Sequence, residues 1–433
     1  MFRKRVVAAV LMAGFVMPAW SQVGSAPADA EFNLEFRAGI NWTDNLGRDI
    51  DGESEVFGSI GTTVAFVRES TRVHTSVVGR ADYFHYDSER FSNEVLGRID
   101  ALLGVSLLPQ RLDWMFENRY GQVRADPFEA EGPGNRGYLN VFETGPDLYL
   151  PVGARSTLGA SGRFTDRRWQ DSDELDSQVL AGEVRVLRLI SPTQRIGLAG
   201  GMRSIDYDGD VFPRYEVYSA YATYGRRLAT GEVNVDVGAN QLRTGGRSET
   251  GLLMRGDWTR ELTARSTLTL AVGREFQDAG DQLAGDSLTV TGFGPTGAVG
   301  LAGDPFTLTF ASATYVLERD RLTWTLSAGW DRERYDSLAA LDRDSLFGRV
   351  ALDYQLNPRM SAGLALSLRR EEFDAFADAT AGEVVAEASL TQRLGRQFDL
   401  LFRYQYAERD ADFGINYEEN RVSLNLIWYP GRR

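Results

Sequence analysis

The sequence predicts an all-β chain that closes into one antiparallel transmembrane β-barrel, a meander of about twenty strands within a range of 16–20. Three observations support this fold class. Hydrophobic side chains recur at every second position, the connections alternate between short and long, and no linker or shift in composition divides the 433 residues. Hydrophobic stripes with helical spacing are scarce, which argues against a helical protein.

The N-terminus has the three parts of a secretory signal peptide. Met1–Arg5 is basic, Val6–Met17 is apolar, and small residues lead to Ser21. We expect cleavage near Ser21, with Ala26 as the second choice. The apolar run is too short to cross a bilayer as a helix. The predicted division is residues 1–21 for the signal peptide and residues 22–433 for the outer-membrane barrel.

The strands follow from an alternation with a period of two. Apolar residues occupy the even positions of 32–42, and mostly polar residues occupy the odd ones. Since successive side chains of a strand point to opposite faces, each strand has an apolar and a polar face. The same pattern predicts strands over 322–330, 346–354, 398–406 and 422–428. Short turns fall near 69–71, 109–110, 191–194, 357–359 and 395–396, and longer, acidic, glycine-rich loops at 43–54, 126–137, 170–176, 277–304 and 374–382.

A soluble β-sandwich or β-helix has the same period, but it buries its apolar face in a core. Charges on the polar face and tryptophans near the strand ends favour a barrel that shows its apolar face to lipid. Trp324 and Trp330 share a face and lie about 20 Å apart along the strand, which suits an aromatic girdle. The candidate girdle residues are Trp42, Trp114, Trp258, Trp324, Trp330 and Trp428.

Opposite charges recur two residues apart on the polar face. Positions i and i+2 of a strand face the same way, so we expect these residues to line the pore and to pair along and across strands. They form either a self-neutralising wall or a selectivity ladder for a charged solute, and the balanced signs favour the wall. The candidate pore-lining residues are Glu35, Arg37, Arg80, Asp82, Arg98, Asp100, Glu117, Arg119, Glu183, Arg185, Arg255, Asp257, Arg349, Asp353 and Arg403.

Composition narrows the chemistry. The chain has no Cys, which excludes disulfides, thiolate metal sites and cysteine nucleophiles. Its two histidines, His74 and His85, are eleven positions apart on one predicted strand and so point to opposite faces. A net charge of −14 argues against binding nucleic acid. We therefore expect no metal site, no cofactor and no nucleic-acid partner.

Three motifs imitate functional sites, and each lacks a required part. Residues 285–288 match the nucleophile block of GDSL esterases, but no histidine follows His85 to activate the serine. Residues 292–297 match a dinucleotide-binding pattern by letters, without a helix to receive the phosphate. Residues 206–210 begin like a Ca²⁺ loop, but valines stand at its sixth and twelfth positions. A hydrolase that uses His85 at the barrel rim is the remaining enzyme hypothesis, and we expect no enzyme.

The first strand followed by Trp42–Asn45, the continuous meander and the ending Asn425–Pro430 resemble a family of outer-membrane β-barrel porins. Members of that family often accompany exopolysaccharide biosynthesis genes. The resemblance extends over the whole mature chain. It implies a channel or secretion port in the outer membrane for polysaccharide or small polar solutes, and no catalytic residues.

Besides the less favoured rim hydrolase, two functional hypotheses remain from the sequence. In the first, the protein is a channel whose lumen is open or plugged, with residues 277–304 as the candidate constriction or lid. In the second, it is a structural or adhesive protein whose acidic loops bind ions, lipopolysaccharide or surface polymer. The expected partners are outer-membrane lipid and lipopolysaccharide, and any periplasmic adaptor would be a separate chain.

Overall fold

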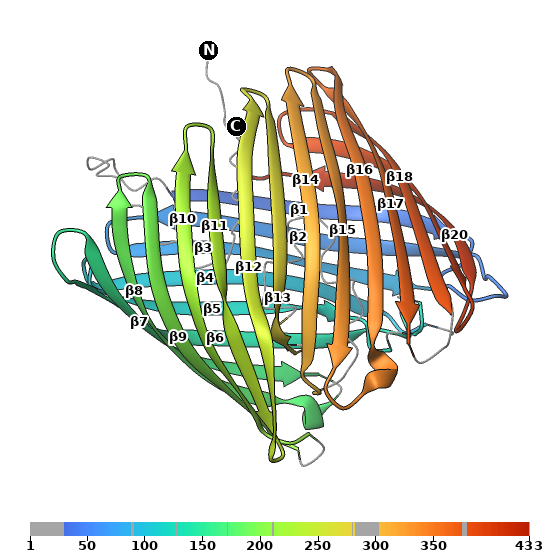
Figure 1. Ribbon diagram of the computed structural model, residues 1–433. Coiled ribbons are helices and arrows are strands. Elements are labelled where there is room, and N and C mark those ends of the chain that lie inside the picture. Colours follow the sequence, from blue (N-terminus) through green and yellow to red (C-terminus); the bar gives the residue numbers. More distant parts are fainter. Residues whose placement is uncertain are drawn as a thin grey trace.

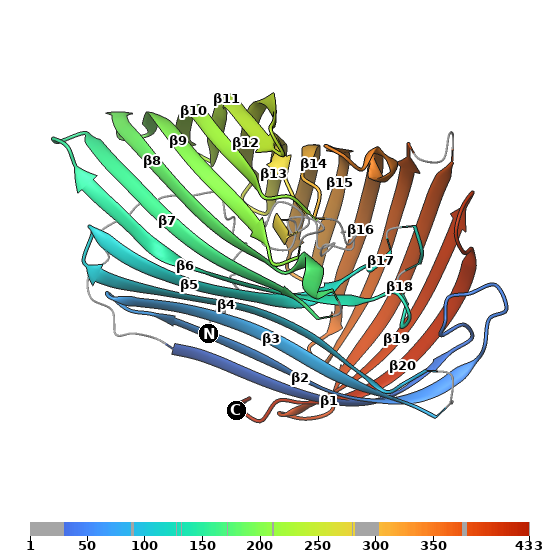
Figure 2. The ribbon, with the colours of Figure 1, turned by 90° about the horizontal axis from the view of Figure 1, so that it is seen from below.

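The computed structural model is a single sheet of twenty antiparallel strands that closes into a barrel (Figures 1 and 2). Each strand pairs with the next along the chain, and β1 pairs with β20 to complete the ring. The predicted all-β meander of about twenty strands is therefore confirmed. The structure describes residues 30–87, 91–126, 128–130, 132–170, 172–209, 212–278, 280–281, 303–374 and 379–432. The strands are β1 (Ala30–Thr43), β2 (Glu55–Glu69), β3 (Val73–Tyr86), β4 (Glu94–Leu108), β5 (Leu112–Val123), β6 (Gly137–Pro151), β7 (Ser156–Trp169), β8 (Ser177–Ser191), β9 (Gln194–Tyr207), β10 (Tyr215–Leu228), β11 (Gly231–Thr244), β12 (Arg247–Thr263), β13 (Ser266–Gln277), β14 (Phe306–Arg319), β15 (Leu322–Tyr335), β16 (Arg343–Asn357), β17 (Met360–Phe373), β18 (Thr380–Arg393), β19 (Phe398–Ala411) and β20 (Tyr417–Trp428).

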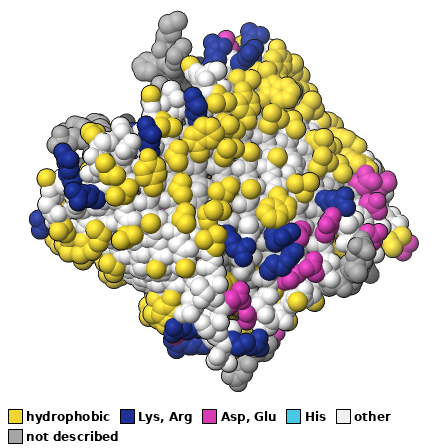
Figure 3. Space-filling model, viewed as in Figure 1, with side chains coloured by type: hydrophobic (Ala, Val, Ile, Leu, Met, Phe, Trp, Pro, Cys, Tyr) yellow, Lys and Arg dark blue, Asp and Glu magenta, His cyan; other side chains and the backbone are white. Residues whose placement is uncertain are grey.

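The alternation of the sequence becomes the two faces of the wall. On β1, Ile40 is 66% exposed on the outer face, whereas its neighbour Asn41 is 6% exposed on the inner face. Large hydrophobic side chains are exposed in the same way on every side of the barrel, and they cover much of the face in Figure 3. A closed barrel with an apolar outer belt is the architecture of outer-membrane proteins, and the chain is located in that membrane.

The two ends of the barrel differ in their connections. The strands β2 and β3, β8 and β9, and β14 and β15 are joined by two or three residues, at the end where β1 begins and β20 finishes. Most connections at the opposite end are longer, and two contain short 3-10 turns, η1 (Asp173–Leu175) and η3 (Ala339–Leu341). Because outer-membrane barrels have short periplasmic turns, the long-loop end is extracellular. Within the described ranges, no helix is long and apolar enough to cross a bilayer.

Several junctions between strands are paired over only part of their length, among them those between β1 and β20, β4 and β5, and β12 and β13. β1 pairs with β2 along its whole length, but with β20 only from Phe36 to Thr43. Near the extracellular end, β12 pairs with β13 only from Met254 onward, so the first part of β12 is bonded to β11 alone. In the amide orientation that satisfies both groups, Asn240 bridges this split. Its nitrogen donates to the Gly251 carbonyl and its oxygen accepts from the Phe276 N–H, each at 3.1 Å.

Inner-face positions become apolar toward the extracellular end. Three clusters of buried side chains pack there, all drawn from strand ends and two of them also from the connections beside those ends. The first contains Val123, Leu139, Val141, Trp169 and Leu175; the second Val179, Ile205, Tyr215, Val217, Leu242 and Phe276; the third Leu46, Phe57 and Tyr86. The core of this protein therefore lies inside the extracellular mouth of the barrel.

Candidate functional site: a charged lumen narrowed at its extracellular mouth

The charged residues predicted to line the pore lie on the inner face of the wall, and most are paired along their own strand. Arg37 Nη1 lies 2.7 Å from Glu35 Oε1, and Arg98 Nε lies 3.1 Å from Asp100 Oδ2. Arg37 also reaches across two strands to Asp82, with 2.9 Å between Nη2 and Oδ1. Pairs of the same i, i+2 type join Arg80 to Asp82, Arg119 to Glu117 and Arg185 to Glu183.

Arg255 and Asp257 pair with other strands instead of with each other. The residue opposite Arg255 on β13 is Gly273, and the ring of Phe310 lies against it. Arg255 Nε donates to Glu275, also on β13, at 2.9 Å. Asp257 accepts a hydrogen bond of 3.0 Å from Asn234 on β11. Cross-strand register therefore decides which partner each of these residues takes.

The last three candidates lie on β16 and β19. Arg349 donates to the hydroxyl of Ser367 at 3.4 Å. Arg403 Nε lies 3.2 Å from a carboxylate oxygen of Glu387 on β18. Asp353 is exposed on the inner face. Arginines and carboxylates thus alternate around the middle of the lumen, so the wall offers many hydrogen-bonding groups and little net charge.

Burial of the inner face changes along the barrel axis. The side chains of Arg80 and Arg98, in the middle of the lumen, are 54% and 52% exposed. Those of Arg167 and Arg343, nearer the extracellular mouth, are 4% and 3% exposed. Water therefore reaches the middle of the lumen, whereas described segments of the chain cover the wall near the mouth.

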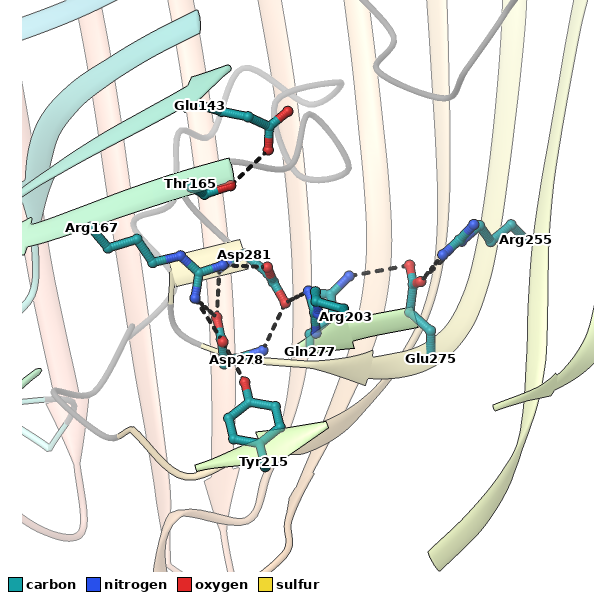
Figure 4. Close-up of polar contacts among 10 residues, drawn as sticks. All are labelled: Glu143, Thr165, Arg167, Arg203, Tyr215, Arg255, Glu275, Gln277, Asp278 and Asp281. Carbon is teal, nitrogen blue, oxygen red and sulfur yellow. Dashed lines mark hydrogen bonds and ion pairs between the residues drawn. The ribbon is translucent and has the colours of Figure 1, made fainter. Parts of the chain in front are cut away.

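In one of these segments, Asp278 and Asp281, which follow β13, are bound to the wall of β7–β10 (Figure 4). Arg167 on β7 donates from Nη1 to both carboxylate oxygens of Asp278, at 2.8 and 2.7 Å, and from Nη2 to Asp281 at 2.7 Å. Arg203 on β9 pairs with Asp281, and the Tyr215 hydroxyl on β10 donates to Asp278. We call Asp278 and Asp281, which these three wall residues hold, the latch.

The two carboxylates of the latch are bound by the wall residues and by each other's backbone N–H groups. Each backbone N–H of the two aspartates donates to the other carboxylate, at 3.2 Å from Asp278 and 2.9 Å from Asp281. Burial by itself would raise the pKa of the Asp278 carboxyl. The guanidiniums of Arg167 and Arg203, with the hydrogen bonds from Tyr215 and Arg167, outweigh burial and lower this pKa from 3.8 to about 2. Asp278 therefore remains ionised well below neutral pH.

The same connection between β13 and β14 is also fixed where it returns to the wall. The carboxylate of Asp304 accepts hydrogen bonds from the N–H groups of Ser337 and Leu338, at 2.8 and 2.9 Å. Gly303 lies against the ring of Phe212, so close that a Cβ there would meet it at 2.6 Å. Residues 277–304 were predicted as a constriction or lid, and of these 279 and 282–302 lie outside the described residues.

In a second segment, Arg124 and Phe128, which follow β5, contact the wall of β17 and β19, far around the ring (Figure 2). Arg124 Nη1 lies 3.5 Å from Glu371, which also pairs with Arg343 at 3.1 Å. Arg409 on β19 donates to the carbonyl of Phe128 at 2.7 Å. The Phe128 ring lies 4.9 Å from that of Phe373 and 6.1 Å from that of Phe413. A loop over 126–137 was predicted, but its contact with β17 and β19 was not.

The six candidate girdle tryptophans have outward-facing positions. Trp42 and Trp428 are exposed at opposite ends of the barrel. Trp428 stacks on Phe36, with 5.5 Å between ring centroids, and the Trp114 indole N–H donates to Thr144 at 2.8 Å. On β15, Trp324 and Trp330 share the outer face, and Trp258 lies on the outer face of β12. Trp169, in contrast, points inward and belongs to a buried cluster.

The residues that suggested enzyme or metal chemistry are dispersed. His85 is exposed on the outer face of β3, whereas His74 faces inward and lies 3.6 Å from Glu69. In the part of the chain that the structure describes, no cluster of three His, Cys, Asp or Glu side chains has the arrangement of a metal site. Asp208 pairs with Arg168 at 2.7 Å. The motifs at 285–288 and 292–297 lie outside the described residues, as does Asp210.

Comparisons with known proteins add structural neighbours only. No protein-family model matches the chain, and no curated protein sequence matches it. The ferric enterobactin receptor PfeA of Pseudomonas aeruginosa is 10% identical with a TM-score of 0.47, over 94% of this chain and 82% of that one. OprD of Pseudomonas aeruginosa is 13% identical with a TM-score of 0.36, over 94% and 98%. The FrpB iron transporter of Neisseria meningitidis is 8% identical with a TM-score of 0.44, over 92% and 81%.

Proposed function

We propose that the protein is an outer-membrane channel that conducts polar solutes through its charge-paired lumen. The observation that supports this proposal is the contrast along the axis. Two arginines in the middle of the lumen, Arg80 and Arg98, are about half exposed, whereas the wall near the mouth is covered by two inward segments. A barrel of about twenty strands is wide enough to leave a lumen that side chains alone do not fill. The latch and the segment Arg124–Phe128 then define its narrow part.

The charge pairing favours uncharged, strongly hydrated cargo. Each of Arg37, Arg98 and Arg185 has a carboxylate partner within its own strand, so the wall presents donors and acceptors without a dominant sign. Such a wall can replace the hydration of hydroxyl groups, whereas a path for one type of ion needs an excess of the opposite charge. Oligosaccharides or small polar solutes fit this chemistry, and the resemblance to porins found with exopolysaccharide genes agrees with a polysaccharide port.

The test is a single-channel recording from the refolded barrel in planar bilayers, after a heat-modifiable gel shift confirms folding. We expect steady steps with weak ion selectivity, and reversible blockade when neutral oligosaccharides are added. Strong selectivity for one ion sign would contradict the cargo proposal. A folded barrel that stays silent, even after the latch is removed, would contradict the channel and favour the structural or adhesive hypothesis.

A further inference from the structure

The outer wall carries a group of arginines just beyond its apolar belt. At the extracellular end of β13–β17, Arg274, Arg332, Arg334 and Arg370 all occupy outward-facing positions. Figure 3 shows basic and acidic side chains gathered in this part of the wall, next to a large hydrophobic area. Charged side chains that face lipid are destabilising at the bilayer midplane and nearly neutral at the interface. At this position the four arginines are tolerated, and their guanidiniums can contact lipid headgroups.

Two of these arginines flank a threonine in one row across three strands. Arg274 on β13 is directly opposite Thr309 on β14, which is directly opposite Arg332 on β15. Strands two apart are about 10 Å from each other, so both guanidiniums can reach a single group above Thr309. Arg274 Nη1 already donates to the Thr309 hydroxyl at 3.1 Å. Among the described residues, no carboxylate lies within ion-pair distance of Arg274.

The row lies at the boundary of the apolar belt. Two residues before Arg332 on the same face is Trp330, and the Arg332 guanidinium lies 5.3 Å from its ring centroid. Toward the periplasm, the outer face of β13 continues with Val272 and that of β14 with Ala311. Aromatic residues mark the interface of membrane barrels, so a guanidinium one step beyond Trp330 lies among the lipid headgroups.

The neighbouring acids leave one side of the row available. Arg332 uses Nε to bind Asp344 at 2.7 Å, and Arg334 binds the other oxygen of Asp344 at 2.7 Å. The side chain of Arg332 nevertheless remains 46% exposed. The acids lie on the β16–β17 side, so an anion is attracted to the β13–β15 side and repelled from the other.

We propose that Arg274, Thr309 and Arg332 bind the phosphate of a phosphorylated lipid in the outer leaflet. Guanidinium groups match phosphate oxygens with paired, charge-assisted hydrogen bonds, and a hydroxyl supplies a further donor. The lipid's acyl chains then lie along the apolar outer face below the row. This inference rests on the barrel spanning the outer membrane, and it is independent of channel activity.

The test uses the refolded full chain in detergent and lipid A that carries its phosphates, with binding followed by native mass spectrometry. The double variant Arg274→Gln/Arg332→Gln is expected to bind at least about tenfold more weakly. The matched control is Arg370→Gln, because Arg370 lies on the same outer face, is 61% exposed and pairs with Glu372. Removing the phosphates from lipid A should weaken binding to the wild type as much as the double substitution does.

Three results would overturn the proposal. The double variant could bind as tightly as the wild type, the control could lose as much affinity, or dephosphorylated lipid A could bind equally well. Inorganic phosphate added alone separates the two sources of the anion, and if it binds as tightly as the lipid, the site recognises free phosphate instead. If the double variant fails to show the heat-dependent gel shift, Thr309→Val removes one donor with little change of shape, and it is expected to weaken binding two- to fivefold, about 0.4–1 kcal/mol.

Discussion

Replacing Arg167 with Gln should release the latch from the wall of β7–β10. Arg167 and Asp278 are 3% and 1% exposed, and they are joined by two hydrogen bonds of 2.8 and 2.7 Å. Removing one partner of such a buried pair costs about 3–5 kcal/mol, because the other charge stays buried without it. If the substitution costs about 4 kcal/mol, the ratio of molecules with a released latch to molecules with a bound latch rises about a thousandfold. A form present in about one molecule in a thousand would then make up about half of the population.

The assay is the open probability of single channels in planar bilayers at neutral pH. Arg167→Gln is expected to raise the open probability or the step size over the wild type. Arg163→Gln is the matched control, because Arg163 is also a buried arginine on β7 but binds Asp147 within the wall, at 2.8 Å. It should lower stability without changing the currents. Equal currents from the wild type and both variants, all with a normal gel shift, would refute the role of the latch.

Three further predictions concern the same mouth. A methyl group at Gly280 would lie 2.6 Å from Arg167 Cζ, so Gly280→Ala should open the channel in the same direction but less strongly, in the same recordings. Because the pKa of Asp278 is lowered from 3.8 to about 2, its stabilising effect is complete above about pH 5 and is lost progressively as the pH falls from there through about pH 2. Currents should therefore be equal at pH 7 and pH 5, and opening between these values would contradict the assignment. Phe128→Ala removes the packing on Phe373, about 2 kcal/mol, and should make the segment after β5 accessible to protease added outside intact cells.

The strands could be predicted from sequence because the two faces of each strand meet different solvents. Lipid outside and water inside impose opposite demands on neighbours such as Ile40 and Asn41, so the period of two persists along the chain. The long and short connections were predicted for the same reason, since they interrupt this period. The signal peptide remains a prediction, because residues 1–29 lie outside the described part of the chain.

The site was only partly predictable. Pairs such as Glu35 and Arg37 lie on one face by geometry alone, so sequence spacing could indicate them. In the latch, Asp278 binds Arg167, and in the second segment Arg124 binds Glu371. These partners lie far apart in the sequence, so no local sequence pattern encodes the contacts. A weaker signal was present, because inner-face positions near the extracellular ends become apolar. Leu139, Val141, Ile205 and Leu242 mark a filled mouth in a barrel whose inner face is otherwise polar.

The partial pairing of β1 with β20 has a consequence for how the ring forms and fails. Residues 30–35 of β1 are held by β2 alone, so this junction has fewer hydrogen bonds than those beside it. Both strands stand at the ends of the chain, and only their mutual pairing turns an open sheet into a ring. We therefore expect this junction to be the last to close and the first to open on heating. Amide protons along residues 421–428 should then exchange with solvent before those of the opposite wall.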